Sequence, residues 1–188
     1  QNVLMWQLDP HMGTLKFNKA NTGGLIREYT CLTYSADGEY LYVGTASGEF
    51  ACIHVRNNLL HSTFSVCAQG VQSMGISIDD KLIIGGGDGT VTLFKGKGKD
   101  FVDTKKKNLN GAVTSLSFGP DCETFIAATT EGDVYRCITN TLSSQLHTQN
   151  HKGPVMALAF LPEVNEKFAT ISEDNTVRYW DVTDYGVK

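Results

Sequence analysis

Short runs of the chain alternate hydrophobic and polar residues with a period of two, and these runs recur at a fixed spacing. Four of them read YTCLTYS, VQSMGIS, VTSLSFG and VMALAFL. Their equivalent residues stand 42 positions apart in three columns: Tyr29, Val71, Val113 and Val155; Leu32, Met74, Leu116 and Leu158; Tyr34, Ile76, Phe118 and Phe160. A period of two is typical of a half-buried β-strand. A constant step in three columns indicates a structural repeat.

Each repeat contains a second and a third strand that are joined by a tight turn. The second runs are EYLYVGT, KLIIGGG, TFIAATT and KFATISE, and the third are FACIHV, VTLFKG, VYRCIT and VRYWDV. Between them lie SGE, DGT, EGD and DNT, whose Gly and Asn residues tolerate the positive φ of a hairpin turn. A more polar run, such as LHSTFS or SQLHTQ, follows each third strand. We therefore expect four antiparallel strands in each unit.

Four-stranded repeats of about 40 to 45 residues are typical of the blades of a β-propeller. No run has a sustained helical period, so the chain is predicted to be all-β, with about seventeen strands and under about a tenth of its residues helical. The string SEDNTVRYWD, in which Asp174 stands six residues before Trp180, resembles the signature of the WD40 repeat family. This resemblance implies a WD40-type β-propeller segment of four-stranded antiparallel blades, a partial propeller in this chain.

The repeat divides the chain into five parts. Residues 1–23 are expected to be the third and fourth strands of a preceding blade, 24–66 a complete blade, 67–108 and 109–149 two degenerate blades, and 150–188 the best-matched WD40 blade without its outer strand. The run NVLMWQLD matches TVRYWDV, which puts Trp6 where Trp180 stands. Because these parts do not make a closed ring, we expect closure to use chain outside them.

His151, Ser172 and Asp174 have the side chains of a hydrolase triad, and this is one reading of the last repeat. The triad reading lacks a G-x-S-x-G nucleophile elbow and places Ser172 inside a hairpin strand. In WD40 propellers, a His of the entering loop, a Ser or Thr, a turn Asp and a Trp form a buried hydrogen-bond chain. The resemblance therefore implies a structural tetrad of His151, Ser172, Asp174 and Trp180.

The other repeats keep few members of this tetrad. The expected equivalents, in blade order, are Leu25, Thr45, Ser47 and Ile53; Cys67, Gly86, Asp88 and Phe94; Leu109, Thr129, Glu131 and Cys137. Replacing both ends of a hydrogen-bond chain by apolar groups leaves no stranded polar partner and can be nearly neutral in stability. Glu131 is the doubtful case, because it is longer than Asp and has no His beside it.

The 188 residues carry a formal net charge of −4, so the whole molecule has no basic excess that would attract nucleic acid or an anionic membrane. Lysines are nonetheless concentrated in KGKGKDFVDTKKKN, which contains six of them: Lys95, Lys97, Lys99, Lys105, Lys106 and Lys107. This stretch is either a solvated outer strand and loop or a contact for an acidic protein surface. Nucleic acid is less favoured, since Phe101 is the only interleaved aromatic residue.

No other pattern in the sequence predicts a site for a nucleotide, a metal ion or a cofactor. The run IIGGGDGTVTLF precedes a strand rather than a helix and lacks the spacing of a phosphate loop, so its glycines are expected in a turn. Asp79 and Asp80 are interpreted as turn residues rather than metal ligands. Five cysteines, with no C-x-x-C pair, fit neither a disulfide framework nor a zinc site and favour a reducing cytosol. We expect no metal, cofactor, membrane or small-molecule substrate.

The degenerate blades, in their order and spacing, also resemble the WD-repeat proteins of cilia and flagella. The runs that carry this resemblance are VLMWQLD, NTGGLIREYTCLTYSADGEYLYVGTASGEF, TEGDVYRCIT and KFATISEDNTVRYWDV. It implies a non-enzymatic scaffold of the cytoskeleton, inside the doublet microtubules of the axoneme, with tubulin, other axonemal proteins and the rest of its own propeller as partners. A general WD40 adaptor for signalling or ubiquitin-ligase complexes is the alternative, because the fold would be the same.

Overall fold

The computed structural model describes residues 2–24, 26–162, 164–181 and 186–187 of the chain. Within these residues all the regular structure is β, with eighteen strands and no helix. The described part accordingly has no helix that is long and apolar enough to cross a membrane. The prediction of an all-β fold built from four-stranded antiparallel sheets is confirmed.

The chain begins with a two-stranded hairpin, which is followed by three sheets of four strands. The hairpin pairs β1 (Leu4–Asp9) with β2 (Thr14–Lys19). The first sheet contains β3 (Tyr29–Tyr34), β4 (Tyr40–Thr45), β5 (Glu49–His54) and β6 (Leu59–Ser65). The second contains β7 (Val71–Ile76), β8 (Leu82–Gly86), β9 (Thr90–Lys95) and β10 (Val102–Asn108). The third contains β11 (Val113–Phe118), β12 (Thr124–Thr129), β13 (Asp133–Ile138) and β14 (Ser144–Gln149).

A fourth sheet contains β15 (Val155–Leu161), β16 (Val164–Ser172), β17 (Val177–Asp181) and β18 (Gly186–Val187). The expectation that the last blade lacks its outer strand is wrong, because β18 pairs with β17 through Trp180↔Val187 and Asp181↔Gly186. This strand has only two residues, and its run GV lacks the alternating pattern on which the strand predictions depend.

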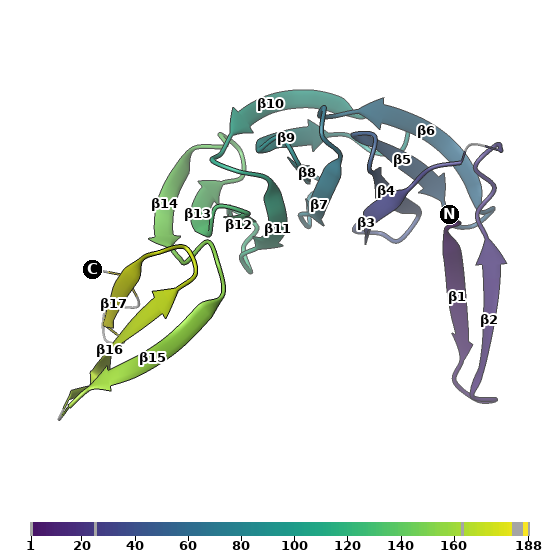
Figure 1. Cartoon of the computed structure of the whole chain (residues 1–188). Coiled ribbons are helices and arrows are strands. Elements are labelled where there is room, and N and C mark those ends of the chain that lie inside the picture. The colour runs from purple at the N-terminus through teal and green to yellow at the C-terminus, as the bar shows by residue number, and fades with distance from the viewer. Residues whose placement is uncertain (1, 25, 163, 182–185, 188) are drawn as a thin grey trace.

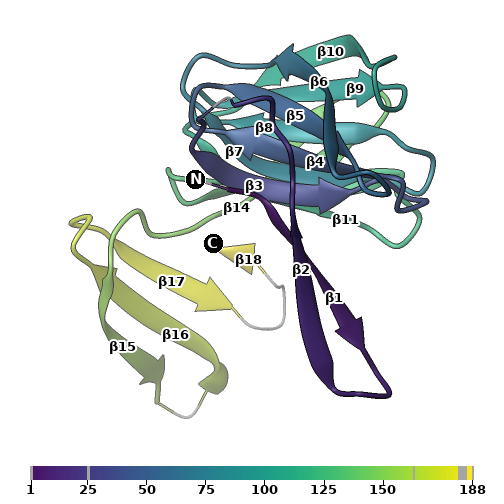
Figure 2. The same cartoon turned by 90° about the vertical axis from the view of Figure 1, so that its right-hand side faces the viewer.

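The three middle sheets form a continuous arc, with the β1–β2 hairpin at one end and the β15–β18 sheet at the other (Figure 1). Turning the molecule shows that both end elements extend away from the stacked middle sheets (Figure 2). In each middle sheet the strands follow one another in chain order, so β3, β7 and β11 lie along the inner side and β6, β10 and β14 form the outer rim. The arc is an open, partial propeller.

Apolar residues fill the two spaces between the middle sheets. Between the first and second sheets, Phe50 is fully buried and its ring lies 5.2 Å from that of Phe94 and 5.5 Å from that of Phe101. Between the second and third sheets, Leu93 packs in a second cluster that includes Phe125. These clusters come from the alternating inward positions of central strands, as expected for sheets buried on both faces.

The inner strands interlock with the neighbouring sheet at glycine positions. A Cβ added to Gly44 would lie 2.6 Å from Cγ1 of Val71, and one added to Gly85 would lie 2.6 Å from Cγ1 of Val113. Since real Cβ atoms do not come so close, each glycine provides the space that a valine of the next repeat occupies. The Ser73 hydroxyl also donates to the carbonyl oxygen of Val113 at 2.8 Å. These contacts fix the stacking of successive sheets.

The turn between β4 and β5 shows why this fold needs glycine in its hairpins. Gly48 has φ = 87°, and a Cβ there would lie 1.9 Å from the carbonyl oxygen of Cys67 in the next repeat. In the last sheet Asn175 takes the equivalent left-handed conformation with φ = 62°. Asn is one of the few non-glycine residues that tolerate this region.

Candidate functional site

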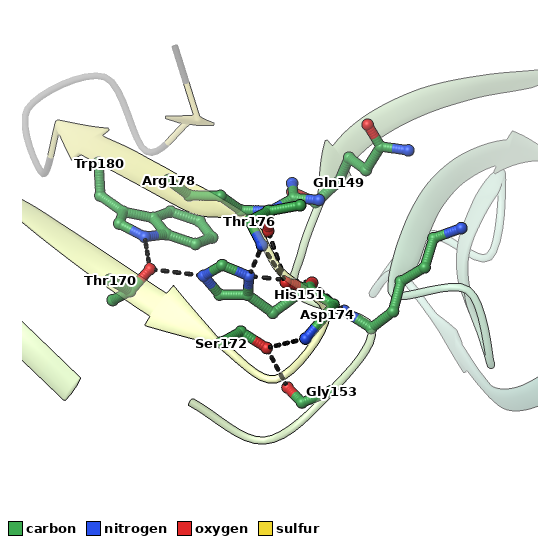
Figure 3. Close-up of polar contacts among 10 residues, drawn as sticks. Gln149, His151, Gly153, Thr170, Ser172, Asp174, Thr176, Arg178 and Trp180 are labelled. Atoms are coloured by element: carbon green, nitrogen blue, oxygen red, sulfur yellow. Dashed lines mark hydrogen bonds and ion pairs between the residues drawn. The ribbon is translucent and has the colours of Figure 1, made fainter. Parts of the chain in front are cut away.

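A polar cluster lies on one face of the last sheet (Figure 3). His151 comes from the loop between β14 and β15, Thr170 from β16, Asp174 from the turn after β16, and Trp180 from β17. Strand pairing places Trp180 opposite Phe168, which is two positions before Thr170 on β16. The turn after β16 directs the side chain of Asp174 toward the loop that holds His151. The side chains of His151 and Asp174 are only 4% and 9% exposed.

The cluster forms a continuous hydrogen-bond chain. The indole N–H of Trp180 donates to Oγ1 of Thr170 at 2.7 Å, and that oxygen lies 2.7 Å from Nε2 of His151. The other ring nitrogen, Nδ1, lies 3.1 Å from Oδ2 of Asp174 and 3.0 Å from Oγ1 of Thr176. A neutral imidazole with its proton on Nδ1 satisfies every member: it donates to Asp174 and accepts the proton of Thr170.

The prediction that Ser172 is the hydroxyl of this chain is wrong, because Thr170 has that role. The Ser172 hydroxyl donates to the carbonyl oxygen of Gly153 at 3.0 Å and accepts from the backbone N–H of Asp174 at 3.3 Å. Ser172 therefore closes the turn, while His151, Asp174 and Trp180 meet through Thr170. Thr170 and Ser172 are two residues apart on one strand face, so their spacing alone does not tell which of them faces the indole.

Asp174 is held as a carboxylate by donors on both sides. The hydroxyl of Thr176 donates to its Oδ1 at 2.6 Å, the backbone N–H of Thr176 donates to the same atom at 2.9 Å, and the backbone N–H of Lys152 donates to Oδ2 at 2.9 Å. These hydrogen bonds, with that of Thr176 foremost, hold the pKa of Asp174 well below its usual value even though burial acts in the opposite direction. The sequence reading missed Thr176, although a hydroxyl two residues after a turn Asp is a usual turn partner.

Thr170, His151 and Asp174 are connected in the order of a catalytic triad, but the hydroxyl is not available to a substrate. Thr170 is 5% exposed, and its oxygen already accepts the indole N–H of Trp180. A nucleophile must reach a carbonyl carbon beside donors that stabilise an oxyanion. The Thr170 hydroxyl is buried and both of its hydrogen-bond partners are protein side chains. The cluster therefore connects the entering loop, the turn and the two strands structurally.

The second sheet keeps only the turn half of the cluster. Asp88 accepts the backbone N–H of Thr90 at 3.0 Å and that of Ala68 at 3.2 Å, which are the counterparts of the two backbone bonds of Asp174. Cys67 stands where His151 would be, and its thiol donates to the carbonyl oxygen of Gly70 at 3.2 Å. Burial raises the pKa of the Cys67 thiol, with a smaller contribution from Asp88. In the first sheet Leu25 lies outside the described residues.

The third sheet has a different polar group in this place. Asp133 is 2% exposed and accepts from Nδ2 of Asn110 at 3.1 Å and from the hydroxyl of Tyr135 at 3.3 Å. Glu131, the doubtful member of the predicted set, points instead to the surface and forms an ion pair with Lys152 at 2.5 Å. The extra length of Glu131 thus lets it reach the next blade rather than its own loop.

The lysine stretch divides into a loop and a strand with different surroundings. In the loop between β9 and β10, Lys97 forms ion pairs with Asp37 and, at 2.7 Å, with Glu39 of the first sheet, and its Nζ lies 5.6 Å from the ring centroid of Tyr40. The carboxylates hold the pKa of Lys97 above its usual value, with Asp37 the larger cause. Lys97 therefore ties two sheets together, and the structure does not leave it as a free cation.

Lys105, Lys106 and Lys107 lie on β10, whose seven residues are all exposed. Nζ of Lys105 donates to the carbonyl oxygen of Asn140 in the third sheet at 3.0 Å, and Lys106 is paired with Asp103 at 2.9 Å. Lys95 and Lys99 are exposed at the two ends of the loop that holds Lys97. Phe101 is 7% exposed in the core, so it cannot stack on a base.

The remaining candidates have ordinary roles in the described part of the chain. Asp79 accepts the hydroxyl of Ser77 and pairs with Lys81, which makes it a turn residue. No group of three or more His, Cys, Asp or Glu side chains among the described residues is arranged to hold a metal ion. The five cysteines are free.

The family model of the WD domain, G-beta repeat, matches residues 143–181. This range holds β14 to β17 and the whole polar cluster. The first two sheets and the strands β11 to β13 of the third, in which the cluster is reduced, lie outside the match.

Curated relatives match a longer part of the chain. Cilia- and flagella-associated protein 52 of Chlamydomonas reinhardtii is 28% identical over 97% of this chain, and that of Homo sapiens is 26% identical over 95%. This chain spans 30% and 29% of the length of those two proteins. Actin-interacting protein 1 of Drosophila melanogaster is 31% identical over 54% of the chain and 17% of its own length. Residues 143–181 are thus a WD40 repeat, and the chain is a partial WD40-type β-propeller that is similar over most of its length to cilia- and flagella-associated protein 52.

Proposed function

We propose that this chain is part of a non-catalytic scaffold of cilia and flagella that docks on tubulin and on neighbouring axonemal proteins. The similarity to cilia- and flagella-associated protein 52, which extends over 97% of the chain, is the observation that carries the proposal. The protein would then be located in the cytoskeleton of the axoneme.

The architecture suits a docking role. Interlocked sheets hold the turns and the rim strands in fixed positions, and binding at such surfaces needs no moving part. The buried hydroxyl of Thr170 supports a structural rather than catalytic use of the polar cluster. A WD40 adaptor in signalling or ubiquitin-ligase complexes would use the same surfaces.

Affinity capture separates the ciliary scaffold from the general adaptor. The tagged protein should capture tubulin and axonemal proteins from ciliated cells. The matched control is capture from the same cell type before cilia form. Equal capture of ubiquitin-ligase or signalling subunits from both cell states, without axonemal proteins, would contradict the ciliary assignment.

The exposed lysines of β10 are the proposed contact for an acidic surface. Exposed charges attract over about 8 Å at physiological salt, so their contribution should fade as ionic strength rises. Replacing Lys105, Lys106 and Lys107 by Ser should weaken co-sedimentation with microtubules at low salt and change it little at high salt. The matched control, Lys16→Ser with Lys19→Ser and Lys167→Ser, removes the same charge from exposed positions elsewhere. Equal loss in both triple variants would mean that net charge alone decides binding.

A further inference from the structure

The outer strand β10 combines a free backbone edge with a row of lysines. It lies at the end of its sheet, in the order β10-β9-β8-β7, and it runs along the rim of the arc (Figure 1). An edge strand presents backbone N–H and C=O groups that another extended chain can pair with. We propose that β10 binds an extended acidic protein segment as an additional strand. This inference rests on the proposed docking function and specifies the chemistry of one partner.

The pairing of β10 with β9 shows which backbone groups point outward. Leu109, just after β10, donates its backbone N–H to the carbonyl oxygen of Gly89 at 2.9 Å. In an antiparallel pair, successive residues direct their backbone groups alternately toward and away from the partner strand. Counting back from Leu109, the backbone groups of Lys107 and Lys105 point toward β9, and those of Asn108 and Lys106 point to the open edge.

The side chains beside this edge favour an acidic partner. Lys105 donates to the carbonyl oxygen of Asn140, so its side of β10 faces the third sheet. Lys107 lies on the same side, because it is two residues further along the strand. Lys106, paired with Asp103, lies on the opposite side. Opposite charges on adjacent antiparallel strands stabilise the pairing. A segment with a carboxylate at every second residue would meet Lys105 and Lys107 together.

Lysines on an edge strand can also prevent pairing with other chains. If that were their purpose here, the other outer strands should carry lysines as well. β6 (Leu59–Ser65) and β14 (Ser144–Gln149) occupy the same outer position in their sheets, and their runs LLHSTFS and SQLHTQ contain no Lys, Arg, Asp or Glu. Asn21 pairs with the start of β6 at Leu59, but the rest of that edge and the edge of β14 have no such pairing among the described residues, so these edges would need protection too. Among the outer strands of the three middle sheets the lysines are confined to β10, whereas β2 of the end hairpin carries Lys16 and Lys19 without a run of adjacent lysines. Three adjacent lysines on one blade are what a specific acidic partner requires.

The test uses a synthetic ten-residue peptide of alternating Glu and Thr, labelled for fluorescence anisotropy, against the whole chain. A second peptide has the same side chains and charge but is N-methylated along its backbone, so that it cannot donate to a strand edge. We expect the N-methylated peptide to bind at least about tenfold more weakly, because it cannot donate backbone N–H groups to the outward carbonyl oxygens of β10. Equal affinity for the two peptides would overturn strand pairing at β10. It would not contradict the proposed ciliary scaffold function, which the affinity-capture experiment tests separately.

A pair of variants tests the same edge from the side of the protein. Lys106→Pro removes an outward N–H that β9 does not use, and Lys106→Thr removes only the charge. The Pro variant should bind the unmodified peptide several-fold more weakly than the Thr variant, because the N–H of residue 106 is then no longer available to a carbonyl oxygen of the peptide. Equal affinity of both variants for the unmodified peptide would overturn the assignment. A thymidine oligonucleotide with the same charge as the peptide provides a further control. If it competes as strongly as the unlabelled peptide does, the site binds any polyanion and the assignment is overturned.

Discussion

At the scale of single residues, Thr170 is the centre of the polar cluster because it joins two groups that cannot pair directly. The indole N–H of Trp180 is only a donor, and Nε2 of His151 acts as the acceptor once the other ring nitrogen donates to Asp174. A hydroxyl can accept from the first and donate to the second. Removing it leaves two buried polar groups unpaired at once.

We therefore expect Thr170→Val to destabilise the protein by about 2 to 6 kcal/mol, since two unsatisfied groups each cost about 1 to 3 kcal/mol. Val keeps the shape of Thr, so packing changes little. Ser172→Ala is the matched control: it should cost about 1 to 2 kcal/mol, less than Thr170→Val, because it removes the hydrogen bond to Gly153 and the longer one from the backbone N–H of Asp174. Denaturant melts of both variants give the comparison. A larger loss for Ser172→Ala would restore Ser172 as the central hydroxyl.

Acid should weaken the same cluster through Asp174. Its pKa in the folded protein lies below the value of 3.8 that applies when unfolded, so its contribution to stability is complete above that value and is lost as the pH falls below it. Asp174→Asn removes this titration. The difference in unfolding free energy between wild type and variant should shrink as the pH is lowered from 6 to 3. A difference that stays constant over this range would show that Asp174 titrates normally.

At the scale of strands and sheets, the glycine and valine interlock explains how one repeat finds the next. Gly85→Ala places a Cβ 2.6 Å from Cγ1 of Val113 and 2.5 Å from Oγ of Ser73, so it should cost about 1 to 3 kcal/mol through overpacking. Val113→Ala should partly relieve this clash. In a double-mutant cycle, the two changes together should then cost less than the sum of the single losses. Strict additivity in denaturant melts would mean that these residues do not compete for space.

The strands were predictable because their signal is local and repeated. The columns that contain Val71, Met74 and Ile76 mark the inner strands, and the turn residues indicate the hairpins between the strands that follow. The two-residue strand β18 was missed because so short a run has no period. Sequence can also assign His151 and Asp174 to one blade, since both stand at fixed distances from the signature Trp180.

Contacts between repeats were not predictable from these patterns. Lys97 and its partner Asp37 are 60 residues apart, and nothing in the sequence near either residue indicates the other. Strand spacing likewise left Thr170 and Ser172 equivalent, because both lie on the same face of β16 and only the three-dimensional position of the indole distinguishes them. Long-range side-chain partners depend on how the sheets stack, which a period along the chain does not encode.

At the scale of the whole molecule, the two ends of the arc leave apolar surface uncovered. On β1 and β2 the cross-strand pairs Trp6↔Phe17 and Leu8↔Leu15 form one row, in which each of these four side chains is at least 56% exposed. On the last sheet Phe160 and Tyr179 are 56% and 68% exposed. Contiguous apolar surface of this kind usually becomes an interface. The middle sheets, in contrast, cover one another.

The chain of 188 residues, studied alone, should therefore self-associate, and the association should depend on these ends. Burying apolar area stabilises by about 25 cal/mol per Å², so four large side chains per hairpin provide several kcal/mol before the entropy of association is counted. Light scattering should give a mass that rises with concentration. Trp6→Ser with Phe17→Ser should shift the chain toward monomer, whereas Leu59→Ser with Leu146→Ser, which removes exposed apolar side chains from the rim strands β6 and β14, should not. If the rim variant dissociates the assemblies and the hairpin variant leaves them intact, the copies meet through their outer strands and the ends of the arc are not the associating surface.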